Sequence, residues 1–296
     1  MTGDAKRAAQ IGLGFMGAAM AKRLMARGWT VTGFDIDAGR RAAAEAAGVA
    51  VAASAAEAAA GAAMVNLCVT STAAVEQAVF GSGGVAEADP APPLLVDMST
   101  TDAEATREMA ARLAERCGAA WVDAPCSGGP PAAEEGALAV MAGGDAQALG
   151  AARPLLEDLA AKVTHMGPAG AGQVTKMINQ VLVLTNFAVL AEALKLGEKA
   201  GVAVERIPEC LGEGYAGSVL LQKMFPRMAA RQYEPAAAFA RQVLKDLDMV
   251  HDLAKKTGTP TPMSDQARGL YRLLVSRGYA ESDPIALLKL YDEGPA

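Results

Sequence analysis

The chain has 296 residues, of which 52% are hydrophobic, so it is long enough for two domains with sizeable cores. Its formal net charge of -6 and sequence pI near 5.1 disfavour a nucleic-acid-binding or anionic-membrane-binding surface. Four separated cysteines and two histidines are a poor inventory for zinc or for a disulfide framework, so we expect a cytoplasmic protein without a structural metal.

The first half of the chain alternates short β-type runs with alanine-rich helical runs. The β-type runs predict strands at residues 8–11, 30–34, 49–52, 64–69, 94–98, 119–123, 138–141 and 163–165. Helices are expected between many of them, for example at residues 16–26, 38–47, 103–116 and 146–159. This alternation predicts an α/β domain with a mainly parallel sheet and helices on both faces.

Beyond Gly167 the strand signals stop. The remaining chain predicts helices at residues 173–200, 204–212, 218–230, 239–257, 264–277 and 285–291. We therefore expect a first domain over residues 1–167 and an all-helical second domain over residues 168–296. The longest apolar run, residues 181–196, is interrupted by polar residues such as Glu192 and Lys195, which favours a core helix over a membrane span.

A glycine-rich segment follows the first predicted strand and opens the first predicted helix. Gly12 permits a tight turn, Gly14 lets a pyrophosphate approach the backbone, and Gly17 allows close contact between helix and strand. The helix N-terminus offers free N–H groups to phosphates. The segment predicts a dinucleotide site of the Rossmann type, although such glycines also occur in plain tight turns. The candidate contacts are Gly12, Leu13, Gly14, Phe15, Met16 and Gly17.

Asp35 ends the second predicted strand, 18 residues beyond Gly17. A carboxylate at this place accepts hydrogen bonds from the adenosine ribose and repels a 2′-phosphate, so it favours NAD over NADP. Arg40 and Arg41 follow and are able to receive a phosphate, so NADP stays possible. A plain strand-end or N-cap aspartate is the structural alternative.

Two further strand ends carry small hydroxyl residues, where open α/β sheets bind their ligands. These ends are residues 67–71 and 97–101. We expect Leu67, Cys68, Thr70 and Thr100 to contact the cofactor. A helix N-cap is the alternative role for a hydroxyl residue in the second of these segments.

Two segments are candidates for substrate chemistry. Ser127, Gly128 and Gly129 form a small polar cradle for a carboxylate, or else an ordinary glycine-rich turn. Lys176 and Asn179 share one helix face, since residues at i and i+3 are neighbours. A donor that can lose its proton, beside a fixed amide, suits the handling of a hydroxyl or carbonyl group, whereas an idle solvated pair is the alternative.

Taken together, these motifs resemble those of the β-hydroxyacid dehydrogenases, the family that includes 3-hydroxyisobutyrate dehydrogenase and tartronate semialdehyde reductase. Four stretches match in order and span nearly the whole chain. They are GLGxMG at residues 12–17, DAPxSGG at 123–129, GxxGxGxxxKxxN at 167–179, and Lys-Asp-Leu at 245–247. The resemblance implies a Rossmann-type first domain, an all-helical second domain, and an active site in the cleft between them.

The resemblance also implies roles for particular residues. Lys176 matches the catalytic general acid and base, and Asn179 the neighbouring amide. Thr100 and Lys245 match residues that contact the cofactor. The substrate carboxylate is expected at Ser127, Gly128 and Gly129.

The implied reaction interconverts a small 3-hydroxyacid and its semialdehyde or keto form, with NAD or NADP as the hydride carrier. The resemblance further implies a homodimer or homotetramer. Two departures fall near the substrate: Cys126 replaces the usual valine, and Gln180 stands where many members have a second asparagine. An imine reductase of the same superfamily, or a catalytically silent nucleotide-sensing module, is the alternative, but such relatives generally lack the lysine.

Overall fold

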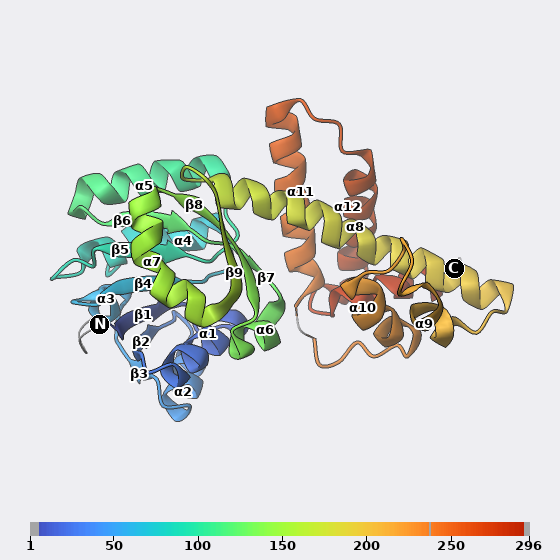
Figure 1. Cartoon of the computed structure of the whole chain (residues 1–296), viewed down its shortest axis with the longest axis horizontal. Helices are drawn as coiled ribbons and strands as arrows, with labels where there is room; N and C mark the ends of the chain where they lie inside the picture. The colour runs from blue at the N-terminus through green and yellow to red at the C-terminus, as the bar shows by residue number, and fades with distance from the viewer. Residues whose placement is uncertain (1–5, 237, 293–296) are drawn as a thin grey trace. The chain divides into compact units, whose positions relative to one another are not determined.

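The computed structural model describes residues 6–236 and 238–292 (Figure 1). The chain divides into two compact units, Met1–Lys176 and Met177–Ala296. The expected boundary between residues 167 and 168 falls where the last strand of the first unit ends, and it stays a prediction.

Among the described residues of the first unit, nine strands form one sheet in the order β3-β2-β1-β4-β5-β6-β8-β7, with β9 beside β8. The strands are β1 (Arg7–Ile11), β2 (Thr30–Phe34), β3 (Ala50–Val51), β4 (Met64–Leu67), β5 (Leu94–Asp97), β6 (Ala120–Asp123), β7 (Cys126–Ser127), β8 (Leu138–Gly144) and β9 (Ala160–Gly167). Strands β1 to β6 pair in parallel, whereas β8 runs antiparallel to β6 and β7. The predicted mainly parallel sheet is confirmed.

Helices cover both faces of this sheet. They are α1 (Phe15–Ala26), α2 (Ala38–Ala46), α3 (Ala55–Ala59), α4 (Thr72–Phe80), α5 (Ala103–Cys117), α6 (Gly129–Glu135) and α7 (Ala146–Leu159), with a 3₁₀ turn at Val85–Glu87. Residues of α1, α6 and α7 contribute to one buried apolar cluster, and residues of α3, α4 and α5 to the other. Several helices begin at an Asp or Ser whose side chain accepts a backbone N–H, as the sequence signals require.

Three features of the sheet differ from expectation. One is β9, which spans Ala160–Gly167 rather than residues 163–165, because its flanking residues also pair with β8. The two-residue strand β7 was not predicted, and β8 continues to Gly144 rather than ending at Met141. The end of β8 consists of alanine and glycine, which carry no β-propensity signal. Its extension follows from pairing with β6 and β9, which is a long-range contact.

The second unit is helical. Its elements are the continuation of α8 (Ala171–Ala200), a 3₁₀ turn (Val204–Arg206), α9 (Ile207–Leu211), α10 (Val219–Ala229), α11 (Ala240–Thr257), α12 (Pro262–Leu274), a π-helical turn (Val275–Tyr279), a 3₁₀ turn (Pro284–Leu288) and α13 (Lys289–Asp292). Every helical stretch predicted beyond Gly167 is present. The stretch over residues 204–212 is split into a 3₁₀ turn and a short helix, because Pro208 favours the first turn of a new helix.

The long helix α8 supplies much of the core of this unit. Leu184, Phe187 and Leu194 are buried in one cluster with apolar residues of α10, α11 and α12. Within the described residues α8 is also the one helix that is long and apolar enough to cross a membrane, and 39% of its most apolar window is buried. Core helices of water-soluble proteins meet the same criterion, so the length and composition of α8 do not distinguish a core helix from a membrane span.

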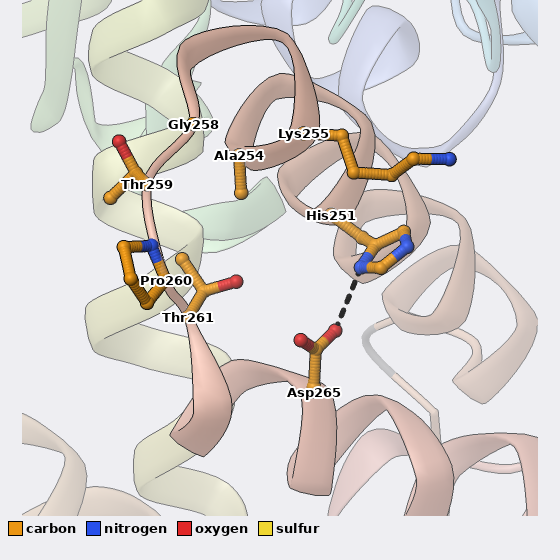
Figure 2. A pocket seen from close by; sticks show the side chains of 8 residues that line it. All are labelled: His251, Ala254, Lys255, Gly258, Thr259, Pro260, Thr261 and Asp265. Carbon is orange, nitrogen blue, oxygen red and sulfur yellow. Dashed lines mark hydrogen bonds and ion pairs between the residues drawn. The ribbon is translucent and has the colours of Figure 1, made fainter.

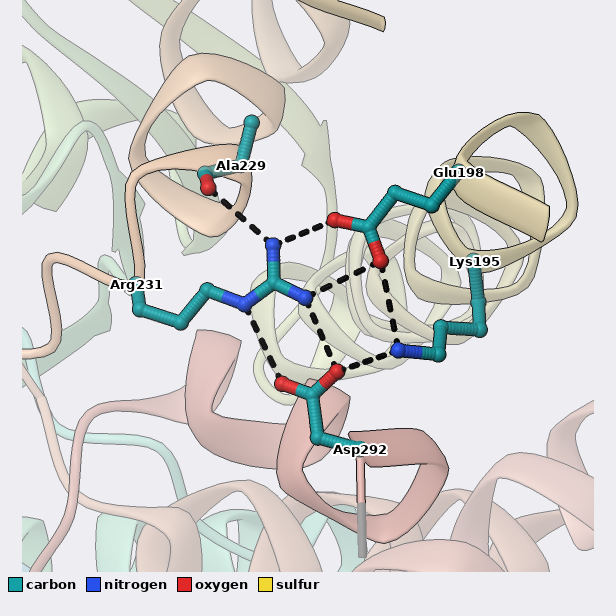
Figure 3. Close-up of polar contacts among 5 residues, drawn as sticks. All are labelled: Lys195, Glu198, Ala229, Arg231 and Asp292. Carbon is teal, nitrogen blue, oxygen red and sulfur yellow. Dashed lines mark hydrogen bonds and ion pairs between the residues drawn. The ribbon is translucent and has the colours of Figure 1, made fainter. Parts of the chain in front are cut away.

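A network of ion pairs fastens the C-terminal half of α8 to two other segments of this unit (Figure 3). Lys195 and Glu198 lie on α8, and Asp292 ends α13. Arg231 follows α10 in a left-handed backbone conformation, with φ of 51°. Its guanidinium donates to both carboxylates, and the Lys195 ammonium lies 2.6 Å from Asp292 Oδ1. These bidentate, partly buried contacts are stronger than isolated surface pairs.

We predict that Glu198→Gln lowers the free energy of unfolding at pH 7 by about 1–2 kcal/mol. Hydrogen bonds from Arg231 hold the pKa of Glu198 below its ordinary value of 4.5. A lowered pKa contributes stability above the unfolded pKa and loses it as the pH falls through the folded pKa. The difference in Tm between wild type and variant, measured by circular dichroism, is therefore expected to shrink below about pH 4.

Glu209→Gln is the control, because the Glu209 side chain is 73% exposed in its pair with Arg206. It is expected to leave Tm unchanged at every pH. A constant Tm difference for Glu198→Gln from pH 3 to pH 8 would contradict the electrostatic explanation.

Candidate active site

The glycine-rich turn and Asp35 are hydrogen-bonded to each other at the carboxyl ends of β1 and β2. Asp35 is buried, and its carboxylate accepts hydrogen bonds from Leu13 N at 2.8 Å and Asp37 N at 2.9 Å. Arg40 Nη1 lies 3.6 Å from Asp35 Oδ2. Asp35 therefore fixes the glycine-rich turn as well as being placed where a ribose is expected.

Two glycines of this turn leave no room for a side chain. A Cβ on Gly12 would lie 2.2 Å from the Cys68 carbonyl oxygen, and one on Gly17 would lie 1.9 Å from the Gly12 carbonyl oxygen. Gly12 also has φ of 88°, which favours glycine. Helix α1 then begins at Gly14 without a side-chain cap, so its N-terminus is suited to a phosphate. The residues present thus fit a dinucleotide.

The loop after β5 is fastened to the start of α8 by Gln173. This side chain is fully buried; its Oε1 accepts from Thr101 N and its Nε2 donates to the Ser99 carbonyl, both at 3.0 Å. The Ser99 hydroxyl in turn accepts from Val69 N at 3.0 Å. The candidate cofactor residue Thr100 therefore sits in a loop held from both sides.

The end of β6 is fastened to the same helix. Asp123 is fully buried; its Oδ1 accepts from Gly170 N at 2.8 Å and its Oδ2 from Gln173 N at 3.1 Å. Three residues later, the carbonyl of Cys126 accepts a hydrogen bond from Lys176 Nζ at 2.9 Å. Ser127 and the left-handed glycines 128 and 129 follow directly. Lys176 is therefore fixed beside the candidate carboxylate cradle.

Lys176 is 8% exposed, and no other lysine or arginine of the described chain is buried. Burying an ammonium group is costly unless polar partners compensate it, so such a lysine is a candidate for chemistry. The nearby thiol is not. Burial raises the pKa of Cys126 to about 11, although the charge of Lys176 acts in the opposite direction.

Two buried carboxylates lie side by side behind this site, since Asp97 of β5 pairs in register with Asp123 of β6. Burial raises the pKa of Asp97 to about 7, against hydrogen bonds from Ser99. Burial also raises the pKa of Asp123, and the N–H groups of Gly170 and Gln173 oppose that shift. The first unit thus carries a titratable pair immediately behind the loop and the helix that hold the candidate site residues.

In the second unit, four polar residues form a chain of contacts. Asn179 Nδ2 donates to Gln180 Oε1 at 2.9 Å, and Gln180 Nε2 donates to Asp246 Oδ2. Lys245 Nζ lies 3.0 Å from Asp246 Oδ1 in an ion pair rather than an aligned hydrogen bond. The candidate residues Asn179 and Lys245 are thereby linked through Gln180 and Asp246.

Two residues of this arrangement were not predicted as functional. Asp123 and Gln173 both stand inside the matched motifs, and both have buried polar side chains. The Asp123 side chain accepts from the start of α8, and the Gln173 side chain connects that start to the loop after β5. The sequence signal was the placement of a polar residue in an otherwise apolar or glycine-rich run. Its partner was not visible, because the contacts join residues 47 to 74 positions apart.

A hollow of about 290 Å³ lies at the turn between α11 and α12 (Figure 2). His251 and Asp265 face each other across one side of it, with 2.9 Å between His251 Nδ1 and Asp265 Oδ1. None of the predicted site residues lines this hollow. We therefore do not assign the active site to it.

Comparison with known proteins covers both parts of the chain. A family model described as the NAD binding domain of 6-phosphogluconate dehydrogenase matches residues 7–167. A second, described as NAD-binding of NADP-dependent 3-hydroxyisobutyrate dehydrogenase, matches residues 170–291. Nearly every described residue therefore falls within a match to a nicotinamide-dinucleotide enzyme.

Individual relatives are similar over most of their length. The NAD-dependent L-serine dehydrogenase of Pseudomonas aeruginosa is 35% identical, over 97% of this chain and 98% of its own. The 2-hydroxy-3-oxopropionate reductase of Escherichia coli is 32% identical, over 76% of this chain and 77% of its own. The structure of 3-hydroxyisobutyrate dehydrogenase from Mycobacterium tuberculosis with L-serine has a TM-score of 0.83 at 31% identity, covering 97% of this chain and 99% of its own.

The imine reductase of Streptomyces aurantiacus is more distant, with a TM-score of 0.64 at 23% identity, and that likeness concerns the fold alone. The two family matches and the relatives above agree with the four motifs read in order along the sequence. The chain is thus a nicotinamide-dinucleotide-dependent oxidoreductase and belongs to the β-hydroxyacid dehydrogenase family.

Proposed function

We propose that this enzyme interconverts a small 3-hydroxyacid and the corresponding aldehyde or ketone, with Lys176 as general acid and base. One observation carries the assignment of Lys176: its buried ammonium group donates to the Cys126 carbonyl at 2.9 Å, next to the Ser127-Gly128-Gly129 segment. This contact supports the proposal because it brings the candidate acid and base next to the candidate carboxylate cradle.

Bound nicotinamide dinucleotide supplies the hydride acceptor or donor. In oxidation, the neutral amine of Lys176 accepts the proton of the substrate hydroxyl at Nζ, and in reduction the ammonium returns it. Ser127 and the backbone of Gly128 and Gly129 hold the substrate carboxylate, and Asn179 orients the reacting oxygen. The positions of the glycine-rich turn and the loop bearing Thr100 support their assignment to the cofactor.

We propose NAD as the preferred cofactor. The buried Asp35 carboxylate lies where a 2′-phosphate would need space, and Asp37 adds a second acidic group two residues later. A backbone hydrogen bond from Arg40 holds the pKa of Asp37 below its ordinary value of 3.8, although desolvation acts against it. Arg40 is exposed and lies 3.6 Å from Asp35 Oδ2, and the half-buried Arg41 donates to the backbone carbonyls of Asp35 and Ile36. Both arginines thus already have acceptors in the chain, so we propose that the two carboxylates disfavour a 2′-phosphate.

For the substrate, we propose a small polar 3-hydroxyacid such as L-serine. A relative that is 35% identical over nearly its whole length is named as an L-serine dehydrogenase. The proposal is tested by following NADH formation with L-serine, L-threonate and 3-hydroxyisobutyrate, each also with NADP. Binding of NAD without turnover of any 3-hydroxyacid would instead favour a silent nucleotide-sensing module.

We predict that Lys176→Ala lowers kcat by about 10²–10⁴-fold, because proton transfer to and from the substrate loses its positioned group. The Kd for NAD, measured by fluorescence titration, is expected to change by less than about threefold. Lys162→Ala is the matched control, since Lys162 lies exposed on β9 of the same unit. If Lys176→Ala loses cofactor affinity and Tm together with kcat, Lys176 has a structural role instead.

Cys126→Val is expected to keep kcat within about threefold of wild type. With a pKa of about 11, roughly one thiol in 10⁴ is ionised at pH 7, so Cys126 is a poor nucleophile. The contact with Lys176 is made by the backbone carbonyl, which valine retains. Steady-state kinetics beside a Cys210→Ser control test this. A loss of 100-fold or more confined to the Cys126 variant would assign the thiol a direct role.

We further propose a homo-oligomer that buries the outer face of α8. Ile178, Leu182, Val189 and Leu196 are 56%, 64%, 45% and 72% exposed, and their spacing places them along one stripe of the helix. Such a stripe suits a second copy of the same helix face in an isologous contact.

The double variant Leu182→Glu, Leu196→Glu is expected to lower the molar mass measured by light scattering to that of one chain. Lys199→Glu, at an exposed position on the same helix, is expected to leave the mass unchanged. Wild-type protein that is monomeric at micromolar concentration contradicts the proposal. Recovery of the wild type only with detergent-extracted membranes would assign the stripe to lipid.

A further inference from the structure

One short segment of chain holds the N-terminal part of α8 at two points. Asp123 accepts hydrogen bonds from the N–H groups of Gly170 and Gln173, at 2.8 and 3.1 Å. Cys126, three residues later, accepts one from Lys176 Nζ through its carbonyl, at 2.9 Å. The segment therefore fixes both the backbone at which the helix starts and the end of the side chain one turn later.

Around the Asp123 carboxylate, the backbones of β8 and α8 approach too closely to leave room for side chains. Asp123 pairs with Gly143 across β6 and β8, and a Cβ on Gly143 would lie 2.7 Å from both Asp123 carboxylate oxygens and from Gly172 N. A Cβ on Gly172 would lie 2.4 Å from the Met141 carbonyl oxygen and 2.7 Å from Asp123 Oδ2. Two glycines thus clear the space in which the carboxylate meets the helix, and the helix has no freedom to shift toward the sheet.

Other helices of the first unit are capped more simply. Asp145 caps α7 by accepting from Gln147 N and Ala148 N at 2.8 and 3.1 Å, but it lies at the surface and next to the helix it caps. Asp123 belongs to a different element, 47 residues before Gly170, and is fully buried. Burying a carboxylate is costly, so simple capping does not account for its placement. What distinguishes α8 from α7 is that α8 carries Lys176.

We propose that Asp123 is a positioning residue for Lys176. Its carboxylate fixes the N-terminal turn of α8, and this sets the distance from which the lysine reaches the Cys126 carbonyl and the adjoining Ser127-Gly128-Gly129 segment. The inference rests on the proposed role of Lys176 as acid and base. Without the two charge-assisted hydrogen bonds the turn loses its anchor, and Nζ is displaced from the substrate oxygen. A displacement of about 1 Å is enough to reduce turnover strongly while leaving binding groups in place.

The test compares Asp123→Ala, Asp123→Asn and the control Asp145→Asn in the full-length enzyme loaded with NAD. Asp123→Ala is expected to lower kcat by about 10–100-fold, with KM and the Kd for NAD changed less than about threefold. Asp123→Asn keeps one carbonyl acceptor, so its kcat is expected to lie between those of the wild type and the alanine variant. Asp145→Asn is expected to match the wild-type kcat, whatever its effect on Tm.

A second readout does not depend on turnover. The reaction of the Lys176 amine with trinitrobenzenesulfonate, quantified by mass spectrometry of the folded enzyme, reports how firmly Nζ is held. Asp123→Ala is expected to raise this rate several-fold at a temperature well below its Tm, and Asp145→Asn is expected not to. A purely structural role would lower Tm without changing either kcat or the labelling rate of the folded enzyme.

The outcomes separate this inference from the proposed function. If Lys176→Ala abolishes turnover while both Asp123 variants keep wild-type kcat and labelling rate, the positioning role is wrong and the acid–base role stands. If Lys176→Ala keeps its activity, the acid–base role itself is wrong. Should Asp123→Ala not fold, Asp123→Asn decides. A wild-type kcat and a wild-type labelling rate of Lys176 overturn the inference, whereas a lower kcat with faster labelling supports it.

Discussion

The close approach of α8 to the ends of β6 and β8 is the constraint on which the candidate site depends. Gly143 and Gly172 are both needed, because any side chain at either place would collide with the Asp123 carboxylate or with backbone atoms. The approach brings the positive end of a 30-residue helix onto a buried carboxylate, where the two partly compensate each other's desolvation. Lys176, one turn along that helix, inherits its position from this contact.

The same helix start also reaches the cofactor side of the sheet. Both polar atoms of the Gln173 side chain are hydrogen-bonded, since its oxygen accepts from Thr101 N and its nitrogen donates to the Ser99 carbonyl. One turn of α8 is therefore hydrogen-bonded to the loop after β5 and to the end of β6. In a parallel sheet these two places are neighbours, because the carboxyl ends of adjacent strands meet at one edge. The sheet topology thus places the loop that carries Thr100 and the segment that contacts Lys176 where one helix start reaches both.

Local sequence signals were sufficient for most of the helices and strands, but not for the contacts between them. The alternation of β-type and alanine-rich runs predicted the strands that form the parallel part of the sheet, and the end of strand signals at Gly167 predicted the helical second part. The two-residue β7 and the Ala-Gly end of β8 were not predicted, because neither has a periodic apolar pattern. Lys176 and the glycine-rich turn were recognisable from motif spacing. Asp123 and Gln173 were not, since their roles depend on partners that only folding brings close.

The two departures from the family pattern differ in what they change. At Cys126 the contact with Lys176 is made by the main-chain carbonyl, so a cysteine in place of a valine keeps the acceptor and alters only the shape and polarity of the adjoining surface. At position 180 the side chain itself makes the contacts. Gln180 is buried, accepts from Asn179 and donates to Asp246, whose other oxygen faces Lys245. Glutamine is one methylene longer than asparagine, so the shorter residue would not span both partners from the same backbone. The first departure therefore changes the surface beside Lys176 in the first unit, whereas the second changes how Asn179 and Lys245 are linked within the second unit.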